Sequence, residues 1–195
     1  MANANSPFGF RPINRDGSPY NGATLRCVIG ATDATAIFIG DAVTIDGSSS
    51  EGYTGVTQSD QGGAVLGVVT AFEVNPDDLG AQYRKALTKR FCQVAVARPG
   101  VYFEVQSDDD TTALAEASVG FNTNWIQTET GSTVYGISGQ ELDSTAISTS
   151  TASDLFIVGL VDRPDNLLSG TGSTNKNVIV SFNNTQIKNA TTGVD

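Results

Sequence analysis

Histidine is absent from this sequence, and tryptophan, methionine and cysteine are scarce, with one, one and two copies. The lack of histidine removes the commonest general base, the Ser-His and Cys-His nucleophile pairs and most zinc sites. No phosphate-binding Gly-Lys-Thr sequence is present, and the glycine-rich segment Gly170–Ser173 lacks the third glycine and the following helix of a dinucleotide loop. We therefore expect that the chain is not an enzyme, and we predict no catalytic residue, no cofactor and no metal ligand.

Cysteine pairs and long apolar runs are also missing. Cys27 and Cys92 lie far apart in apolar segments, without metal-ligand spacing or a disulfide framework, so we expect buried free thiols. No apolar run approaches the length of a membrane span, and the N-terminal residues lack the pattern of a secretory signal. We expect a chain that is made and folded in a cytosol and has no membrane partner.

Positive charge is in short supply, with 11 basic against 21 acidic residues and a net charge of −10. Such a chain repels phosphate backbones, so we expect no nucleic-acid partner. The acidic run Asp108–Asp110 lies near Glu104 and resembles a cation site only loosely, since it lacks the alternating spacing and central glycine of a calcium loop. We interpret it as a solvated turn that begins a short helix.

Glycine, threonine, serine and asparagine outnumber strong helix formers, and the apolar segments are short and β-branched, which predicts a mainly β protein. At 195 residues one substantial core is expected. We predict a single β-barrel or jelly-roll-like sandwich domain over residues 23–183, with one or two short helices. The expected strands cover residues 23–29, 36–39, 41–45, 64–74, 155–161 and 178–182.

Other segments give more specific local predictions. Alternating apolar residues over 91–107, interrupted by Arg98-Pro99-Gly100, predict a hairpin with one buried side. Asn75 and Pro76 favour a helix start, and the stretch to Arg90 is left open between a helix and a long loop. Residues 111–119 have the composition of a short helix that Gly120 ends.

The first 22 residues combine apolar rings with residues that prevent regular structure. Phe8, Phe10 and Tyr20 are costly to leave in water, while the prolines among them remove backbone donors and favour extended chain. We predict an extended N-terminal arm over residues 1–22 that lies along another surface and folds on binding. Residues 184–195 lack periodicity and are predicted to form a flexible C-terminal tail.

The opening MANANSPFGFRP resembles the start of a family of tailed-bacteriophage virion proteins, the head decoration or cement proteins. Further matches follow in the same order along nearly the whole chain, at residues 19–24, 40–43, 99–106, 119–122, 137–139, 141–143 and 163–166. The resemblance implies an acidic, enzyme-free β module on the capsid exterior, usually a homotrimer, that clamps adjacent subunits of the major capsid protein.

The resemblance and the arm together lead to a binding hypothesis. The arm would add extended backbone to a neighbouring protein, with Phe8 and Phe10 filling pockets and Arg11 pairing with a carboxylate or carbonyl. Pro12 and Tyr20 complete the predicted partner-binding set. Removal of residues 1–22 is expected to leave the core folded and to abolish attachment to the capsid.

Two other functions stay open at this stage. One is a virion surface protein that binds a receptor or glycan. The other is a hydrolase that uses the carboxylates of Asp108, Asp109 or Asp110.

Overall fold

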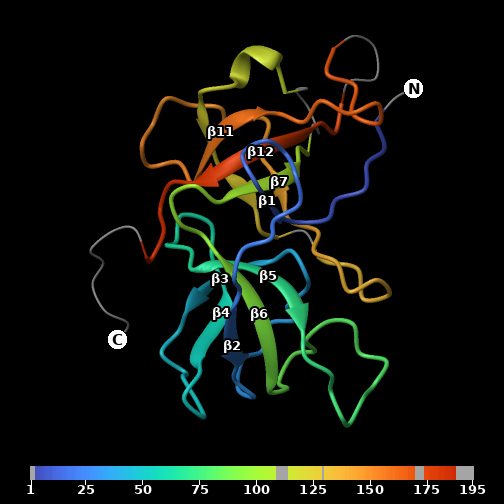
Figure 1. The fold of residues 1–195 in the computed structure, drawn as a ribbon, viewed down its shortest axis with the longest axis vertical. Helices are drawn as coiled ribbons and strands as arrows, with labels where there is room; N and C mark the ends of the chain where they lie inside the picture. Colours follow the sequence, from blue (N-terminus) through green and yellow to red (C-terminus); the bar gives the residue numbers. More distant parts are fainter. Residues whose placement is uncertain (1–2, 109–113, 129, 170–173, 188–195) are drawn as a thin grey trace.

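The computed structural model describes residues 3–108, 114–128, 130–169 and 174–187. It confirms a mainly β fold, built in two parts that are stacked along the long axis of the molecule (Figure 1). Among the described residues, no helix is long and apolar enough to cross a membrane. The strands are β1 (Arg11–Ile13), β2 (Leu25–Ile29), β3 (Ala42–Ile45), β4 (Thr54–Gln58), β5 (Gly67–Phe72), β6 (Arg90–Val96), β7 (Tyr102–Gln106), β8 (Asn122–Thr123), β9 (Trp125–Ile126), β10 (Glu141–Leu142), β11 (Leu155–Leu160) and β12 (Asn177–Phe182).

The lower part in Figure 1 is a closed barrel with the strand order β2-β4-β3-β5-β6. Every neighbouring pair in it is antiparallel except β2 and β4, which are parallel. The barrel encloses its own apolar cluster, which includes Ile29, Val56 and both cysteines. Cys27 and Cys92 are free and fully buried, which confirms the prediction of buried thiols.

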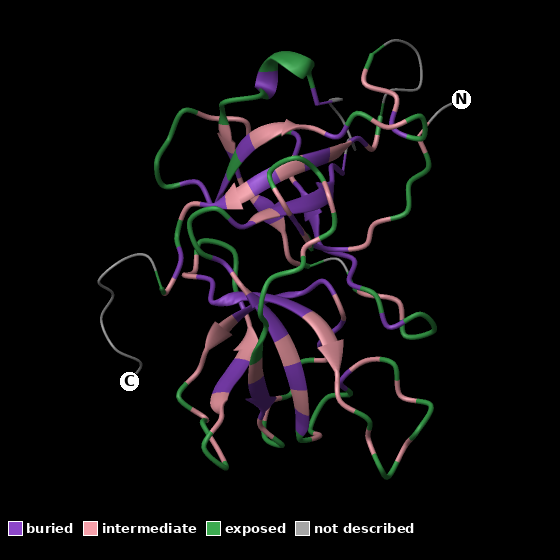
Figure 2. Cartoon of the chain, viewed as in Figure 1, coloured by how far each residue is buried: buried purple, intermediate pink, exposed green. Residues whose placement is uncertain are grey.

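The upper part is a five-stranded sheet with the order β1-β7-β12-β11-β8, and β9 and β10 form a separate two-stranded ribbon. In β12 the apolar Val178, Val180 and Phe182 are buried and alternate with half-buried residues, as the period-2 pattern predicted. The larger apolar cluster joins this sheet to the barrel residues Ala42 and Val68. Figure 2 shows buried residues along the strands of both parts and exposed residues in the loops.

The predicted hairpin over residues 91–107 is wrong, although its two strands and its turn exist. Gly100 has a φ of 92° in the turn, and Val101 donates to the Arg98 carbonyl. However, β6 pairs with β2 and β5 inside the barrel, while β7 pairs with β1 and β12 in the sheet. Apolar alternation reports which face of a strand is buried, and it carries no information about the partner strand.

Residues 75–89 form a loop, which decides the alternative that the sequence left open. Two buried arginines hold this loop through its carbonyl groups. Arg90 donates to the carbonyls of Ala81 and Tyr83, and Arg84 donates to that of Thr88. The carbonyls that would accept hydrogen bonds from backbone amides in a helix thus accept them from guanidinium groups here.

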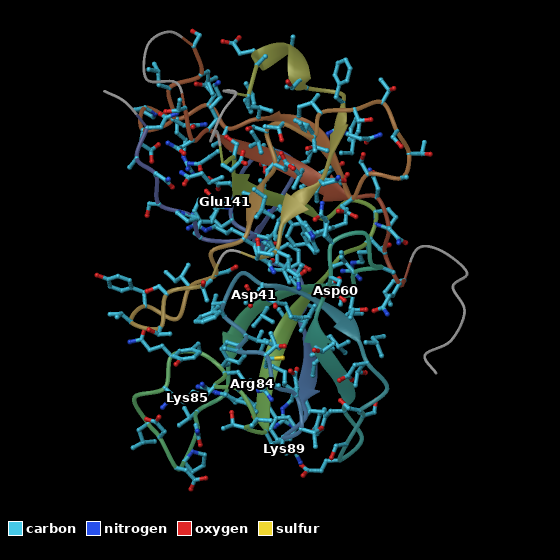
Figure 3. All side chains as sticks on the ribbon, turned by 180° about the vertical axis from the view of Figure 1, so that it is seen from behind. Asp41, Asp60, Arg84, Lys85, Lys89 and Glu141 are labelled. Carbon is cyan, nitrogen blue, oxygen red and sulfur yellow. The ribbon has the colours of Figure 1, made fainter. Side chains whose placement is uncertain are left out.

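Arg84 is fully buried and also ties this loop to the loop that follows β2. It donates to the carbonyls of Gly30 and Asp33, at 2.6 and 2.8 Å, and to that of Thr35. Its guanidinium lies 3.6 Å from the Asp33 carboxylate. Figure 3 shows Arg84 within the barrel part of the molecule.

Two predictions at the ends of elements need adjustment. The helix expected over residues 111–119 is a 3₁₀ turn at Glu116–Ser118, and residues 111–113 lie outside the described residues. The C-terminal tail was expected from residue 184, but Val65 donates to the Asn184 carbonyl and Gln186 donates to the Val65 carbonyl. The body therefore holds the chain as far as Gln186, and residues 188–195 lie outside the described residues.

The N-terminal arm crosses the end of the barrel at two glycines. Gly9 and Gly40 have φ values of 68° and 98°, and a Cβ on Gly40 would lie 2.5 Å from the Phe8 carbonyl oxygen. Phe10 then donates to the Gly40 carbonyl at 2.8 Å, and Ser138 donates to the Ile39 carbonyl at 2.8 Å. We call this crossing of residues 8–10, 39–41 and 136–138 the junction.

Immediately beyond the junction, Phe10 enters the larger apolar cluster. Its ring is 1% exposed, with centroids 5.1 Å from Trp125 and 4.9 Å from Phe182. The first strand of the sheet, β1, then follows directly from this anchor. Removal of residues 1–22 would delete part of the core, so the expectation that such a truncation leaves the core intact no longer holds.

We expect Phe10→Ala to lower the free energy of unfolding by about 3 to 5 kcal/mol, because it removes a buried ring that contacts two other aromatic residues. The matched control is Phe156→Ala on β11 of the same sheet, where the ring is 37% exposed. This control should lose about 1 kcal/mol. Denaturant unfolding of both variants checks the prediction, and equal losses would contradict it.

Candidate partner-binding groove

A groove of about 600 Å³ lies beside the junction, between the arm and the barrel. Its volume is within the range of sites that hold small ligands or side chains of a partner. The arm supplies one wall, from Phe8 to Gly22, and the barrel supplies Ile39, Val69 and Thr70. The lining also includes Thr24, Gly40, Glu104, Ile137 and Arg163.

All five arm residues that the sequence indicated for partner binding line this groove. They do not contribute equally to its surface. Phe10 is buried in the core and has almost no exposed surface, whereas Phe8, Pro12 and Tyr20 are half-buried and Arg11 is exposed. Phe8, Arg11, Pro12 and Tyr20 therefore form the accessible part of the predicted set.

The arm is held along its own sheet by side-chain amides. The Gln106 side chain on β7 accepts from the Ser6 amide and donates to the Ala4 carbonyl. Asn3 accepts from the Leu167 amide and donates to the Thr174 carbonyl. These bonds hold residues 3–6, and the pairing of β1 with β7 holds residues 11–13. The arm that forms one wall of the groove therefore has a fixed path in the structure of the chain alone, whereas the sequence predicted an arm that folds on binding.

Glu104 and Arg163 are groove residues that sequence reasoning did not select as site residues. The predicted single buried side of the strand left Glu104 on the other, solvated side, but it is 3% exposed and its carboxylate lies against the Arg163 guanidinium. The Arg163 guanidinium binds its carboxylate with two contacts, Nη2–Oε1 at 2.6 Å and Nη1–Oε2 at 3.2 Å. No sequence signal connects two residues that are 59 positions apart.

The predicted backbone addition to a neighbour is not available at β1. Along one edge of a strand, alternate residues present their backbone groups, which here means Phe10, Pro12 and Asn14. Phe10 donates to Gly40, Asn14 donates to Ser18, and Pro12 has no N–H group. The outer edge of β1 thus offers no free donor to an added strand, and contacts in the groove must come from side chains.

In the described residues, the acidic run Asp108–Asp110 does not form a second candidate site for catalysis or cation binding. Asp108 is buried and its carboxylate accepts from the Ser144 amide at 2.9 Å, which is a structural role. Asp109 and Asp110 lie outside the described residues. Within the part of the chain that the structure describes, no group of three or more metal-ligating side chains gathers.

Asp41 lies at the junction, next to the groove residue Gly40, and is 1% exposed (Figure 3). Its Oδ2 accepts from the Phe38 amide at 2.9 Å and from the Gln58 side chain at 3.2 Å, and Ser138 also hydrogen-bonds to it. Burial nevertheless raises the pKa of Asp41 from the ordinary 3.8 to about 6, because desolvation of the charged form outweighs these hydrogen bonds.

This raised pKa makes the stability of the junction depend on pH. Protonated Asp41 favours the folded chain, so its contribution is fully present below pH 3.8 and is lost as the pH rises through about 6. The difference between the two pKa values corresponds to about 3 kcal/mol. We expect wild type to gain up to that amount, relative to Asp41→Asn, between pH 7.5 and pH 4.

Denaturant unfolding at several pH values measures this difference. Asp77→Asn, at an exposed loop position, is the control and should track the wild type at every pH. A constant difference between wild type and Asp41→Asn across this range would show that the Asp41 carboxylate does not titrate as described.

Comparisons of this chain with protein-family models, with curated proteins and with solved structures found no match.

Proposed function

We propose that this chain is a structural protein of a tailed-phage virion, of the decoration or cement type. It binds the outside of the head and clamps adjacent subunits of the major capsid protein, as a homotrimer, without catalysing a reaction. The sequence resemblance supports the class of protein, and the groove supports the mode of binding.

The observation that carries the mode of binding is that the arm residues indicated by the sequence line one preformed groove. Preorganisation lowers the entropic cost of association, because the pairing of β1 with β7 and the hydrogen bond from the Phe10 amide to the Gly40 carbonyl already hold the arm before a partner arrives. Apolar rings beside charged groups are also typical of contacts that dominate binding energy. Phe8, Arg11, Pro12 and Tyr20 are the residues we propose as the contact surface.

Clamping follows from geometry and copy number. A stable protein interface buries on the order of 1,600 Å². Three linked copies that engage neighbouring capsid subunits together dissociate far more slowly than one copy, because each rebinding event occurs at high effective concentration. A modest groove contact in each copy is then sufficient to reinforce the shell against internal pressure.

The test uses heads of the encoding phage prepared without this protein. We expect the purified wild-type chain to cosediment with these heads and to raise the temperature at which they rupture. The double variant Phe8→Ala/Arg11→Gln should bind at least about tenfold more weakly, since it removes two accessible groove side chains. Arg15→Gln, at an exposed position of the same arm, is the matched control and should bind like the wild type.

Failure of the wild-type chain to cosediment with the heads, or rupture temperatures that it does not change, would overturn the proposal. Binding of the chain to purified host polysaccharide in place of heads would favour a receptor- or glycan-binding virion protein.

A further inference from the structure

The groove contains the buried carboxylate of Glu104, and each of its two oxygens already accepts a hydrogen bond from Arg163. Glu104, Arg163 and Arg11 are the charged residues of its lining. Two contacts from the Arg163 guanidinium hold Glu104, whose side chain is 4% exposed. Arg163 therefore supplies both hydrogen bonds to Glu104, and Arg11 supplies none.

The Arg11 guanidinium is oriented by the Phe8 ring but donates no hydrogen bond to Glu104. Its Nη1 lies 4.0 Å from the nearer Glu104 oxygen, which is beyond hydrogen-bond distance, and within the described residues its guanidinium makes no hydrogen bond. The guanidinium carbon lies 4.5 Å from the Phe8 ring centroid, and the side chain is 57% exposed. Stacking on the ring restricts the plane of the guanidinium and leaves its fork of donors open to solvent.

The surroundings select the kind of anion that fits. The Arg163 guanidinium is shared between Glu104 and Asp165, whose carboxylate lies 3.3 Å from its Nε, so Arg11 is the cation of the lining that has donors left for an anion. The groove also presents apolar surface from Pro12, Ile39 and Ile137. A ligand that combines a carboxylate with an apolar side chain satisfies both features.

We propose that the groove binds an acidic and apolar peptide segment of the partner protein. One Asp or Glu carboxylate of that segment binds the Arg11 guanidinium through two parallel hydrogen bonds, and a neighbouring apolar side chain packs on the groove floor. The inference rests on the proposed function for the identity of the partner, whereas the chemistry of the groove is independent of it.

The experiment titrates the purified full chain with the blocked dipeptide acetyl-Asp-Phe-amide and, separately, with acetyl-Asn-Phe-amide. NMR follows the Arg11 Nε–H signal and the backbone amides of the groove residues Thr24 and Thr70. We expect the Asp peptide to bind about tenfold more tightly than the Asn peptide, since it alone makes charge-assisted hydrogen bonds. Arg11→Gln should abolish this preference, and Arg15→Gln should keep it.

Equal affinities for the two peptides, or an Asp preference that survives Arg11→Gln, would overturn the inference. The peptide assay contains no phage particle, so its outcome is separate from that of the head-binding test. A chain that prefers the Asp peptide but does not bind heads would retain this groove chemistry and lose the proposed function. A chain that binds heads but shows no preference for the Asp peptide would retain the proposed function and lose this groove chemistry.

The two cysteines form a second site, independent of the groove. Cys27 on β2 and Cys92 on β6 are directly opposite in the antiparallel register, and both side chains face the barrel interior. Opposite residues of antiparallel strands have Cα atoms about 4.5 to 5.5 Å apart, which lies within the span that a disulfide bridges. This pairing was not predictable from the sequence, because 64 residues lie between the two positions.

We propose that Cys27 and Cys92 form an intramolecular disulfide when a peroxide is present. One thiol loses its proton, and its thiolate attacks hydrogen peroxide to give a sulfenic acid and hydroxide, which takes up that proton to form water. The second thiol then displaces hydroxide from the sulfenic sulfur, which forms the S–S bond and a second water. Two electrons and two protons thus pass from the thiols to one peroxide. Burial raises the pKa of Cys27 to about 11, so the first step is slow at neutral pH.

Incubation of the folded chain with hydrogen peroxide, followed by denaturation and alkylation, tests the cross-link by mass spectrometry. We expect a product that is lighter than the reduced chain by two hydrogens, that takes up no alkylating agent, and that melts at a higher temperature than the reduced chain. Cys92→Ala is the control and should give no such product. Two alkylated cysteines after prolonged treatment, or sulfinic acid as the main product, would overturn the proposal.

Discussion

The close approach of two backbones at Gly9 and Gly40 is the contact on which the arm, the sheet edge and the groove depend. A side chain at either position would meet backbone or Ser138 atoms at about 2.5 Å, and both residues have positive φ values. The crossing directs Phe10 into the core and starts β1 on the edge of β7. Without it, the arm would have no fixed path along the sheet, and the groove would lose one wall.

The sequence predicted most strands of this fold but not how they are distributed between its two parts. The alternation in β12 and the apolar run of β11 were sufficient to locate those strands, because burial of one or both faces leaves a direct pattern. The partners of β6 and β7 were not predictable in this way. A tight turn at Gly100 permits a hairpin, and only the closure of the barrel around β6 excludes it.

The residues that the arm contributes to the candidate site were predictable from the sequence, and those that the rest of the chain contributes were not. Rings beside prolines marked Phe8 and Tyr20 as residues that need a surface, and both line the groove. The same reasoning could not show that Phe10 packs in the core of its own chain, since an apolar ring in the sequence is equally compatible with a core and with an interface. Arg84 and Glu104 were missed because their partners are carbonyls and charges from distant segments, which leave no local pattern.

Pro12 occupies the middle of the outer edge of β1, where neighbouring amides are already used by Gly40 and Ser18. An open edge strand can pair with the edge strand of another molecule, and repeated pairing of this kind leads to aggregation. One imino acid, flanked by two occupied amides, stops such growth at this edge. Molecules that are crowded together can therefore meet here through specific side chains without seeding fibres.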